Sequence, residues 1–139
     1  MPYEVKPLPE LLAIEITLAS RLTIEDLRLV ASEVLFLAAQ TGFRRALVDC
    51  RDYLGGAGLG QVSFLTAQVS NRPVSDRGIE AFITPADPDA AADVQFYVRV
   101  ANYLGTRVRV FATREDAIQW LTTMQQDEVR TGDNRSGGT

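Results

Sequence analysis

Residues 45–50 read RALVDC, a run of strand length whose centre is continuously apolar. Such a run, in which apolar and polar residues do not alternate, is typical of a central strand buried on both faces of a sheet. A helical pattern precedes it from Thr23 to Gln40. Thr23 and Asp26 have the spacing of an N-terminal capping box, and Gly42 suits the C-cap. The stretch is therefore predicted to be the central strand of a sheet flanked by helices.

Further from this centre, strand and helix patterns continue to alternate. Upstream, residues 11–18 alternate with a period of two, which predicts a half-buried strand, and residues 3–6 can pair with them as a hairpin. Downstream, the patterns are a helix to about residue 71, a strand at 79–84, a helix at 89–104 capped by Asp89, a strand at 107–111 and a helix from Thr113. This order predicts an α/β fold with a single domain, in which a mainly parallel four- or five-stranded sheet is flanked by helices.

The composition fits one domain and excludes several kinds of site. The 139 residues are 46% apolar, enough for one core, and the formal net charge of −4 leaves no basic surface for nucleic acid. The single cysteine cannot form an internal disulfide, and the absence of histidine removes most Ser/His, Cys/His and zinc mechanisms. No apolar run has the length of a membrane span. We therefore expect a cytoplasmic domain at residues 1–124 without cofactor or metal, followed by a disordered polar tail at 125–139.

The last third of the chain carries the most specific resemblance to a known family. Residues 108–111 read VRVF and lead to a predicted helix with Glu115, Ala117, Trp120 and Leu121, which resembles the end of the SpoIIAA-like family of STAS-type domains. In that family a strand ending in Phe leads to a helix carrying Glu-x-Ala-x-x-Trp-Leu. The family's central strand, loop and next helix are resembled by Ala46-Leu47-Val48-Asp49, Asp52-Tyr53, the glycines that follow and Phe64. The resemblance covers roughly residues 10–123.

The resemblance implies a sheet of four or five strands flanked by helices, in a protein that is not an enzyme. The best-known relatives are anti-sigma-factor antagonists, which are switched by phosphorylation of a serine at the start of the helix after the central strand. Residues 49–58 contain no Ser or Thr, and Ser63 lies inside the predicted helix. The implied function is thus a regulatory or protein-interaction module of STAS type without the usual phosphorylatable serine. Some relatives resemble lipid-binding or small-ligand-binding proteins, which implies the alternative of a binding domain for a small apolar or lipid-like ligand.

Two further groups of residues are candidates for binding. Glycines allow an anion to approach backbone amides at a helix N-terminus. A possible anion or ligand loop therefore comprises Asp49, Asp52, Gly55, Gly56 and Gly58. Their spacing fits neither G-x-G-x-x-G nor the phosphate loop of nucleotide-binding proteins, so a turn that needs positive φ angles is the simpler interpretation. For the ligand alternative, a possible pocket lining comprises Phe64, Phe96, Tyr97 and Tyr103.

Two single residues are interpreted as structural. Cys50 lies beside Arg51, which can lower the pKa of a thiol, but without histidine a buried small residue is the better interpretation. Trp120 shares a predicted helix face with Leu121 and is interpreted as an anchor in the core.

The helix predicted from Thr23 has apolar residues on two sides. At about 100° per residue, one wide face is predicted to cover the core and consists of Ile24, Leu27, Val30, Ala31, Val34, Leu35, Leu37 and Ala38. Leu29 and Phe36 fall two turns apart on the opposite, polar face. An aligned apolar pair on that face indicates an interface, unless another part of the same chain covers it. We therefore expect a protein partner, and in particular a homodimer, whose contact includes Leu29 and Phe36.

Overall fold

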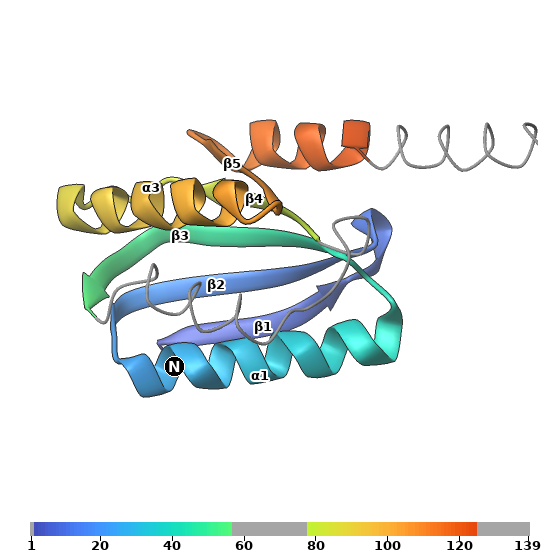
Figure 1. The fold of residues 1–139 in the computed structure, drawn as a ribbon, viewed down its shortest axis with the longest axis horizontal. Coiled ribbons are helices and arrows are strands. Elements are labelled where there is room, and N and C mark those ends of the chain that lie inside the picture. Colours follow the sequence, from blue (N-terminus) through green and yellow to red (C-terminus); the bar gives the residue numbers. More distant parts are fainter. Residues whose placement is uncertain (1, 57–77, 125–139) are drawn as a thin grey trace, which may run out of the picture.

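The computed structural model describes residues 2–56 and 78–124, which form one mixed sheet with helices on both faces (Figure 1). The strands are β1 (Tyr3–Leu8), β2 (Ala13–Leu22), β3 (Arg45–Gly56), β4 (Ile79–Ile83) and β5 (Arg107–Phe111). The helices are α1 (Ile24–Thr41), α3 (Pro88–Tyr103) and a segment at 114–124, and η1 (Pro9–Leu11) is a 3-10 turn. The predictions for Gly58, Ser63, Phe64, the helix to about residue 71 and the tail at 125–139 lie outside the described residues.

The sheet order is β1-β2-β3-β4-β5, so the five described strands lie side by side in chain order. β1 pairs with β2 as an antiparallel hairpin, and each later strand is parallel to the one before it. The predicted fold class, a single α/β domain with a mainly parallel sheet of four or five strands, is confirmed. Because each parallel crossover returns the chain to the same end of the sheet, α1 and α3 run in the same direction.

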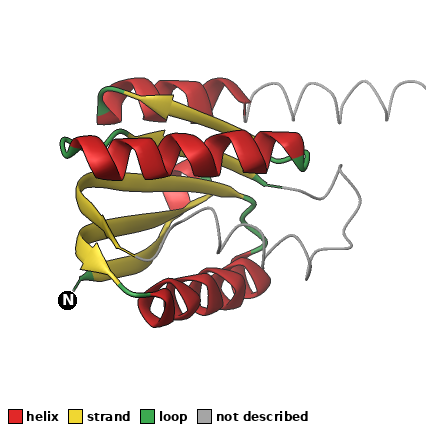
Figure 2. Cartoon of the chain, turned by 60° about the vertical axis from the view of Figure 1, so that its left-hand side comes forward, coloured by secondary structure: helices red, strands yellow, loops and turns green. Residues whose placement is uncertain are grey.

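The two faces of the sheet carry separate apolar clusters. On one face, α1 and α3 contribute Leu27, Val30, Val94 and their neighbours, which pack on apolar side chains of the strands. On the other face, the segment 114–124 packs Ala117 and Leu121 against the middle strands. Figure 2 shows the long axes of α1 and α3 roughly aligned, with strands between and behind them.

The predicted ends of α1 are confirmed. The Thr23 hydroxyl accepts a hydrogen bond from the Asp26 N–H at 3.0 Å, and the Asp26 carboxylate accepts one from the Thr23 N–H at 3.0 Å. Gly42, with φ of 76°, closes the helix by donating to the Ala38 carbonyl. Two residues assigned to the core face, Ile24 and Leu35, are exposed instead, because the buried face centres on Leu27 and Val30 and is narrower than predicted.

β2 differs from the predicted half-buried strand. It extends to Leu22 and is buried on both faces over most of its first half, where even Glu15 is buried. The Glu15 carboxylate is neutralised by Arg114 at 2.6 Å and Lys6 at 3.6 Å. The alternation of polar and apolar residues predicted that Glu15 faces water. Glu15 instead faces Lys6 of β1 and Arg114 of the segment 114–124, and these two cations compensate its charge.

β3 is the largest correction to the predicted boundaries. It does not stop near Cys50 but continues to Gly56, so that Asp52, Gly55 and Gly56 lie in the strand and not in a loop after it. Gly55 and Gly56 have φ angles of 86° and 124°, so the predicted positive φ angles are confirmed, although the two residues lie in a strand and not in a turn. A Cβ atom at Gly56 would overlap the carbonyl oxygen of Leu22, so close pairing with β2 also requires glycine there.

The last third of the chain is close to the prediction, with two corrections. The cap of α3 is Asp87 and not Asp89: its carboxylate accepts a hydrogen bond from the Ala90 N–H at 3.0 Å, which leaves Pro88 at the first helical position. Trp120 is only partly buried. Its ring lies 5.6 Å from that of Phe111, and the Arg109 guanidinium lies over both rings. It packs at the rim of the second apolar cluster and does not anchor its centre.

Candidate interaction surface on the helical face

The outward side of α1 carries the two residues that the sequence singled out. Leu29 is 46% exposed and Phe36 is 63% exposed. The inner side of the helix is already occupied by Leu27 and Val30, which are buried against the sheet. Seven residues correspond to about 10.5 Å along a helix, so Leu29 and Phe36 lie in one line on the solvent side. The structure therefore places this pair on the surface, where a partner can reach it.

The outward side of α3 carries a second pair of the same kind, which the sequence analysis placed differently. Phe96 is 55% exposed and Tyr103 is 90% exposed. Both were assigned to a possible pocket lining, and the structure places them on the solvent side of α3, because Ala90, Val94 and Ala101 form its inner side. The sequence contains a signal for this outward position. Small or branched residues at helical spacing mark the inner side of α3, and the seven-residue spacing of Phe96 and Tyr103 then aligns both on the outward side.

Tyr97, the remaining described member of the predicted lining, is used inside the structure. Its hydroxyl donates to the Glu80 carboxylate of β4 at 2.7 Å, and its ring lies 5.2 Å from the ring of Phe82. Burial raises the pKa of Glu80, although the hydrogen bond from Tyr97 opposes this effect. Burial likewise raises the pKa of Tyr97, and the nearby Glu80 charge adds to it. The pair fastens α3 to the sheet, so the ring and the hydroxyl of Tyr97 are both engaged within the structure.

A second tyrosine and carboxylate pair fastens α3 about one turn nearer its start, at Asp93. The Tyr53 hydroxyl of β3 donates to the Asp93 carboxylate at 2.6 Å, and the Tyr53 side chain is fully buried. Burial and the Asp93 carboxylate both raise the pKa of Tyr53. No local sequence pattern predicts this bond, since forty residues separate the partners.

The remaining candidates on β3 are also occupied by structural contacts. Asp49 is held by Arg51, whose Nε and Nη2 atoms lie 3.0 and 2.7 Å from its two oxygens. This hydrogen-bonded guanidinium lowers the pKa of Asp49, against the effect of burial. Cys50 is buried, as interpreted from the sequence, and burial raises the pKa of its thiol. Asp52 is exposed. The described members of the predicted anion loop thus lie along β3, and Asp49 is engaged with Arg51.

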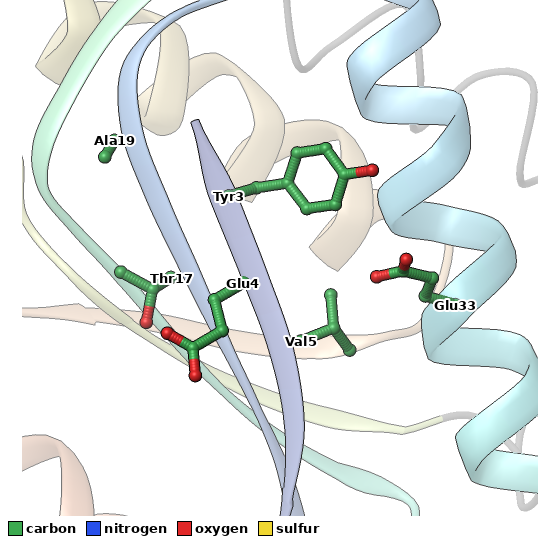
Figure 3. A pocket seen from close by; sticks show the side chains of 6 residues that line it. All are labelled: Tyr3, Glu4, Val5, Thr17, Ala19 and Glu33. Carbon is green, nitrogen blue, oxygen red and sulfur yellow. The ribbon is translucent and has the colours of Figure 1, made fainter. Parts of the chain in front are cut away.

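A depression of about 470 Å³ lies beside β1. Figure 3 shows Tyr3 and Val5 extending from β1 toward α1, and Glu33 extending from α1 toward β1. Its other lining residues are Glu4, Thr17 and Ala19. Two carboxylates at an open rim do not suit an apolar ligand, because binding would desolvate both of them.

The described ranges lack two further features, a membrane-spanning helix and a metal-binding cluster. In residues 2–56 and 78–124, no helix combines the length and apolar character needed to cross a bilayer. Within the same ranges, no cluster of three or more His, Cys, Asp or Glu side chains is arranged to hold a metal ion.

Comparisons with known proteins concern the fold. The chain is similar to a crystal structure from Shewanella loihica PV-4, an uncharacterised protein of the DUF3478 family with a SpoIIAA-like fold. The TM-score is 0.55 and the sequence identity 19%, and the match covers 86% of this chain and 91% of that chain. No family model matches the sequence, and no curated protein matches it. Together with the sheet order, the structural match shows that this chain is an α/β domain with a SpoIIAA-like fold.

Proposed function

We propose that this chain is a non-enzymatic, regulatory protein-interaction module of STAS type, and that it forms a homodimer through the outward side of α1. The observation that carries the proposal is the exposure of Leu29 and Phe36 on a helix whose opposite side is already packed on the sheet. Large apolar side chains that line up on a surface mark contact sites more often than isolated ones do. A second copy of the chain is the partner that is always present, and two-fold dimers are the commonest assemblies.

The composition of α1 supports a contact at this position. The second half of the helix, residues 34–41, contains no charged side chain. The outward line from Leu29 to Phe36 passes the small residue Ser32, which lets another helix approach closely. Depletion of charge at the centre of a contact, with aromatic and aliphatic side chains present, is the usual composition of interfaces.

The interior polar groups support a function without catalysis. The Tyr53 and Tyr97 hydroxyls both donate to carboxylates, and Asp49 is held by Arg51. Burial raises the pKa of the Cys50 thiol, which opposes formation of a thiolate. The chain also contains no histidine to act as a base toward any of these groups. These contacts support a structural role for each of the four groups.

The function as a binding domain for a small apolar or lipid-like ligand is the weaker alternative. It needs aromatic side chains around a shared cavity, whereas Phe96 and Tyr103 are exposed and Tyr97 is bonded to Glu80. The depression beside β1 is lined by Glu4 and Glu33 as well as by apolar groups. We therefore favour the interaction module.

The test is the oligomeric state of a double variant, Leu29→Glu with Phe36→Glu. The wild-type chain is expected to be a dimer at tens of micromolar in light scattering coupled to size exclusion, and the variant a monomer with an unchanged circular dichroism spectrum. The control, Gln119→Glu with Thr123→Glu, adds the same charge to exposed positions on the helix of the other sheet face and should remain dimeric. A monomeric wild-type chain at these concentrations would refute the dimer.

A further inference from the structure

We propose that the surface which α1 meets is α3 of the second copy, so that Leu29 packs on Phe96 and Phe36 packs on Tyr103, with Glu33 paired to Arg99. This inference rests on the proposed function and adds the identity of the opposite surface. The dimer then contains two identical contacts, α1 on α3 and α3 on α1.

The placement of the two helices makes such a contact possible. α1 and α3 pack on the same face of the sheet, as their buried residues belong to one cluster. They also run in the same direction: in Figure 1 both begin at the left and end at the right. A two-fold axis parallel to the helices therefore brings α1 of each copy alongside α3 of the other without reversing either helix. A contact of this kind closes on itself and yields a dimer, not a filament.

The apolar residues match in register. Leu29 and Phe36 are seven residues apart, and so are Phe96 and Tyr103. An offset of 67 positions therefore sets Leu29 opposite Phe96 and Phe36 opposite Tyr103 at the same time. All four side chains are exposed, and three of them are aromatic. Aromatic residues of this kind dominate the binding energy of many interfaces.

The charges match in the same register and select the parallel orientation. Viewed from the start of each helix, Glu33 lies about 50° clockwise of the line through Leu29 and Phe36. Arg99 lies about 50° anticlockwise of the line through Phe96 and Tyr103. When two helices pack in the same direction, the clockwise side of one meets the anticlockwise side of the other. The offset from Glu33 to Arg99 is 66 positions, so the two side chains also meet at nearly the same height.

Both charged residues are exposed, and Glu33, which extends toward β1 at the depression, lies on the flank of the outward side of α1. Neither Glu33 nor Arg99 forms an ion pair with a described residue of its own chain. In an antiparallel contact the two would lie on opposite flanks of the apolar line. The same chain thus carries an apolar helix face with an acidic residue on α1 and an aromatic helix face with a basic residue on α3. Because their spacing matches, a second copy of the chain is favoured over an unrelated partner.

The test is a charge reversal measured by sedimentation equilibrium at low ionic strength. Glu33→Arg and Arg99→Glu alone are each expected to raise the dimer dissociation constant about tenfold or more, because each places like charges together. The double variant restores the opposite pairing and is expected to return to within about threefold of the wild-type constant. Glu10→Arg and Arg21→Glu change the net charge equally at exposed positions outside both helices, and they should leave dimerisation unchanged.

The outcomes separate this inference from the proposed function. If the wild-type chain is monomeric, the proposed function fails as a whole. If Leu29→Glu with Phe36→Glu gives a monomer while the double charge reversal is no tighter than the single variants, α1 meets another surface and only this inference is overturned. Phe96→Glu with Tyr103→Glu provides an independent check, since an α1 to α1 contact would leave that variant dimeric and the contact proposed here would not.

Discussion

α1 and α3 pack on the same face of the sheet, but different chemistry holds them there. α1 is attached by large aliphatic side chains, led by Leu27 and Val30. α3 presents mostly small residues to the sheet and is fastened at two points by hydrogen bonds, from Tyr53 to Asp93 and from Tyr97 to Glu80. One helix is therefore held mainly by apolar burial, and the other combines close packing with buried polar pairs.

This difference explains why the outward side of α1 was easier to predict than that of α3. In α1 the largest apolar residues dominate the inner side, so the side opposite to them is recognisable. In α3 two of the three aromatic residues, Phe96 and Tyr103, are outside, whereas Ala90, Ala101 and the third aromatic residue, Tyr97, face the sheet. The size of an apolar side chain is therefore a poor guide to the inner side of a helix that lies close to a sheet, because small residues allow the close contact.

The largest effect should come from the apolar attachment of α1. Leu27→Ala removes a buried side chain and leaves a cavity, so we expect the free energy of unfolding to fall by about 2–5 kcal/mol. The measurement is urea denaturation followed by circular dichroism. The matched control is Leu35→Ala on the same helix, which is exposed and should change stability by less than about 0.5 kcal/mol. Equal effects of the two substitutions would mean that α1 is rotated on the sheet.

The polar attachment of α3 should cost less to break. Tyr53→Phe keeps the buried ring and removes one hydrogen bond to the Asp93 carboxylate, and we expect a loss of about 1.5–3 kcal/mol. Tyr103→Phe is the control, because that side chain is almost fully exposed in the single chain and the substitution keeps the ring that the proposed dimer uses. If Tyr53→Phe were as mild as the control in the same urea titration, the view that hydrogen bonds fasten α3 would be wrong.

The N-terminal caps test whether the two helices begin as described. Thr23→Ala at the start of α1 and Asp87→Ala at the start of α3 each remove the side chain that accepts a hydrogen bond from an N–H of the first turn. Such a loss typically lowers the free energy of unfolding by about 1 kcal/mol. Asp89→Ala should have a smaller effect, since Asp89 lies within the first turn and is not the cap. Thermal melting of the three variants compares them directly. A larger loss at Asp89 than at Asp87 would restore the boundary that the sequence pattern indicated.

The fold could be read from the sequence because its main signals are local. The capping box at Thr23, the glycine after α1 and the apolar run at Ala46–Val48 each depend on a few neighbouring residues. The length of β3 could not be read in this way. Asp52, Gly55 and Gly56 are residue types that favour loops, but pairing with β2 holds this stretch in a strand.

The candidate site was predictable to a smaller extent for the same reason. Leu29 and Phe36 stand out on their own helix, so the outward side of α1 was found. The hydrogen bonds of Tyr53 and Tyr97 join residues 40 and 17 positions apart, and no local pattern reveals them. Placing Phe96 and Tyr103 correctly depended on knowing what the inner side of α3 contacts.

The smallest effect distinguishes the two attachments by their response to pH. Burial raises the pKa of Glu80 above its ordinary value of 4.5, so the folded chain binds this proton more tightly than the unfolded chain does. The stabilisation from Glu80 is therefore fully present below the ordinary pKa and is lost as the pH rises through the raised pKa of the folded state. Glu80→Gln cannot titrate, but its side-chain carbonyl can still accept the bond from Tyr97.

We therefore expect Glu80→Gln to flatten the dependence of stability on pH and to gain relative to the wild-type chain as the pH rises toward neutral. Urea titrations at several pH values from about 4 to 8 measure the difference. Glu25→Gln, at an exposed position on α1, controls for the loss of one negative charge. A difference between Glu80→Gln and the wild-type chain that stays constant with pH would show that Glu80 does not titrate in this range. The polar attachment of α3 would then be as insensitive to pH as the apolar attachment of α1.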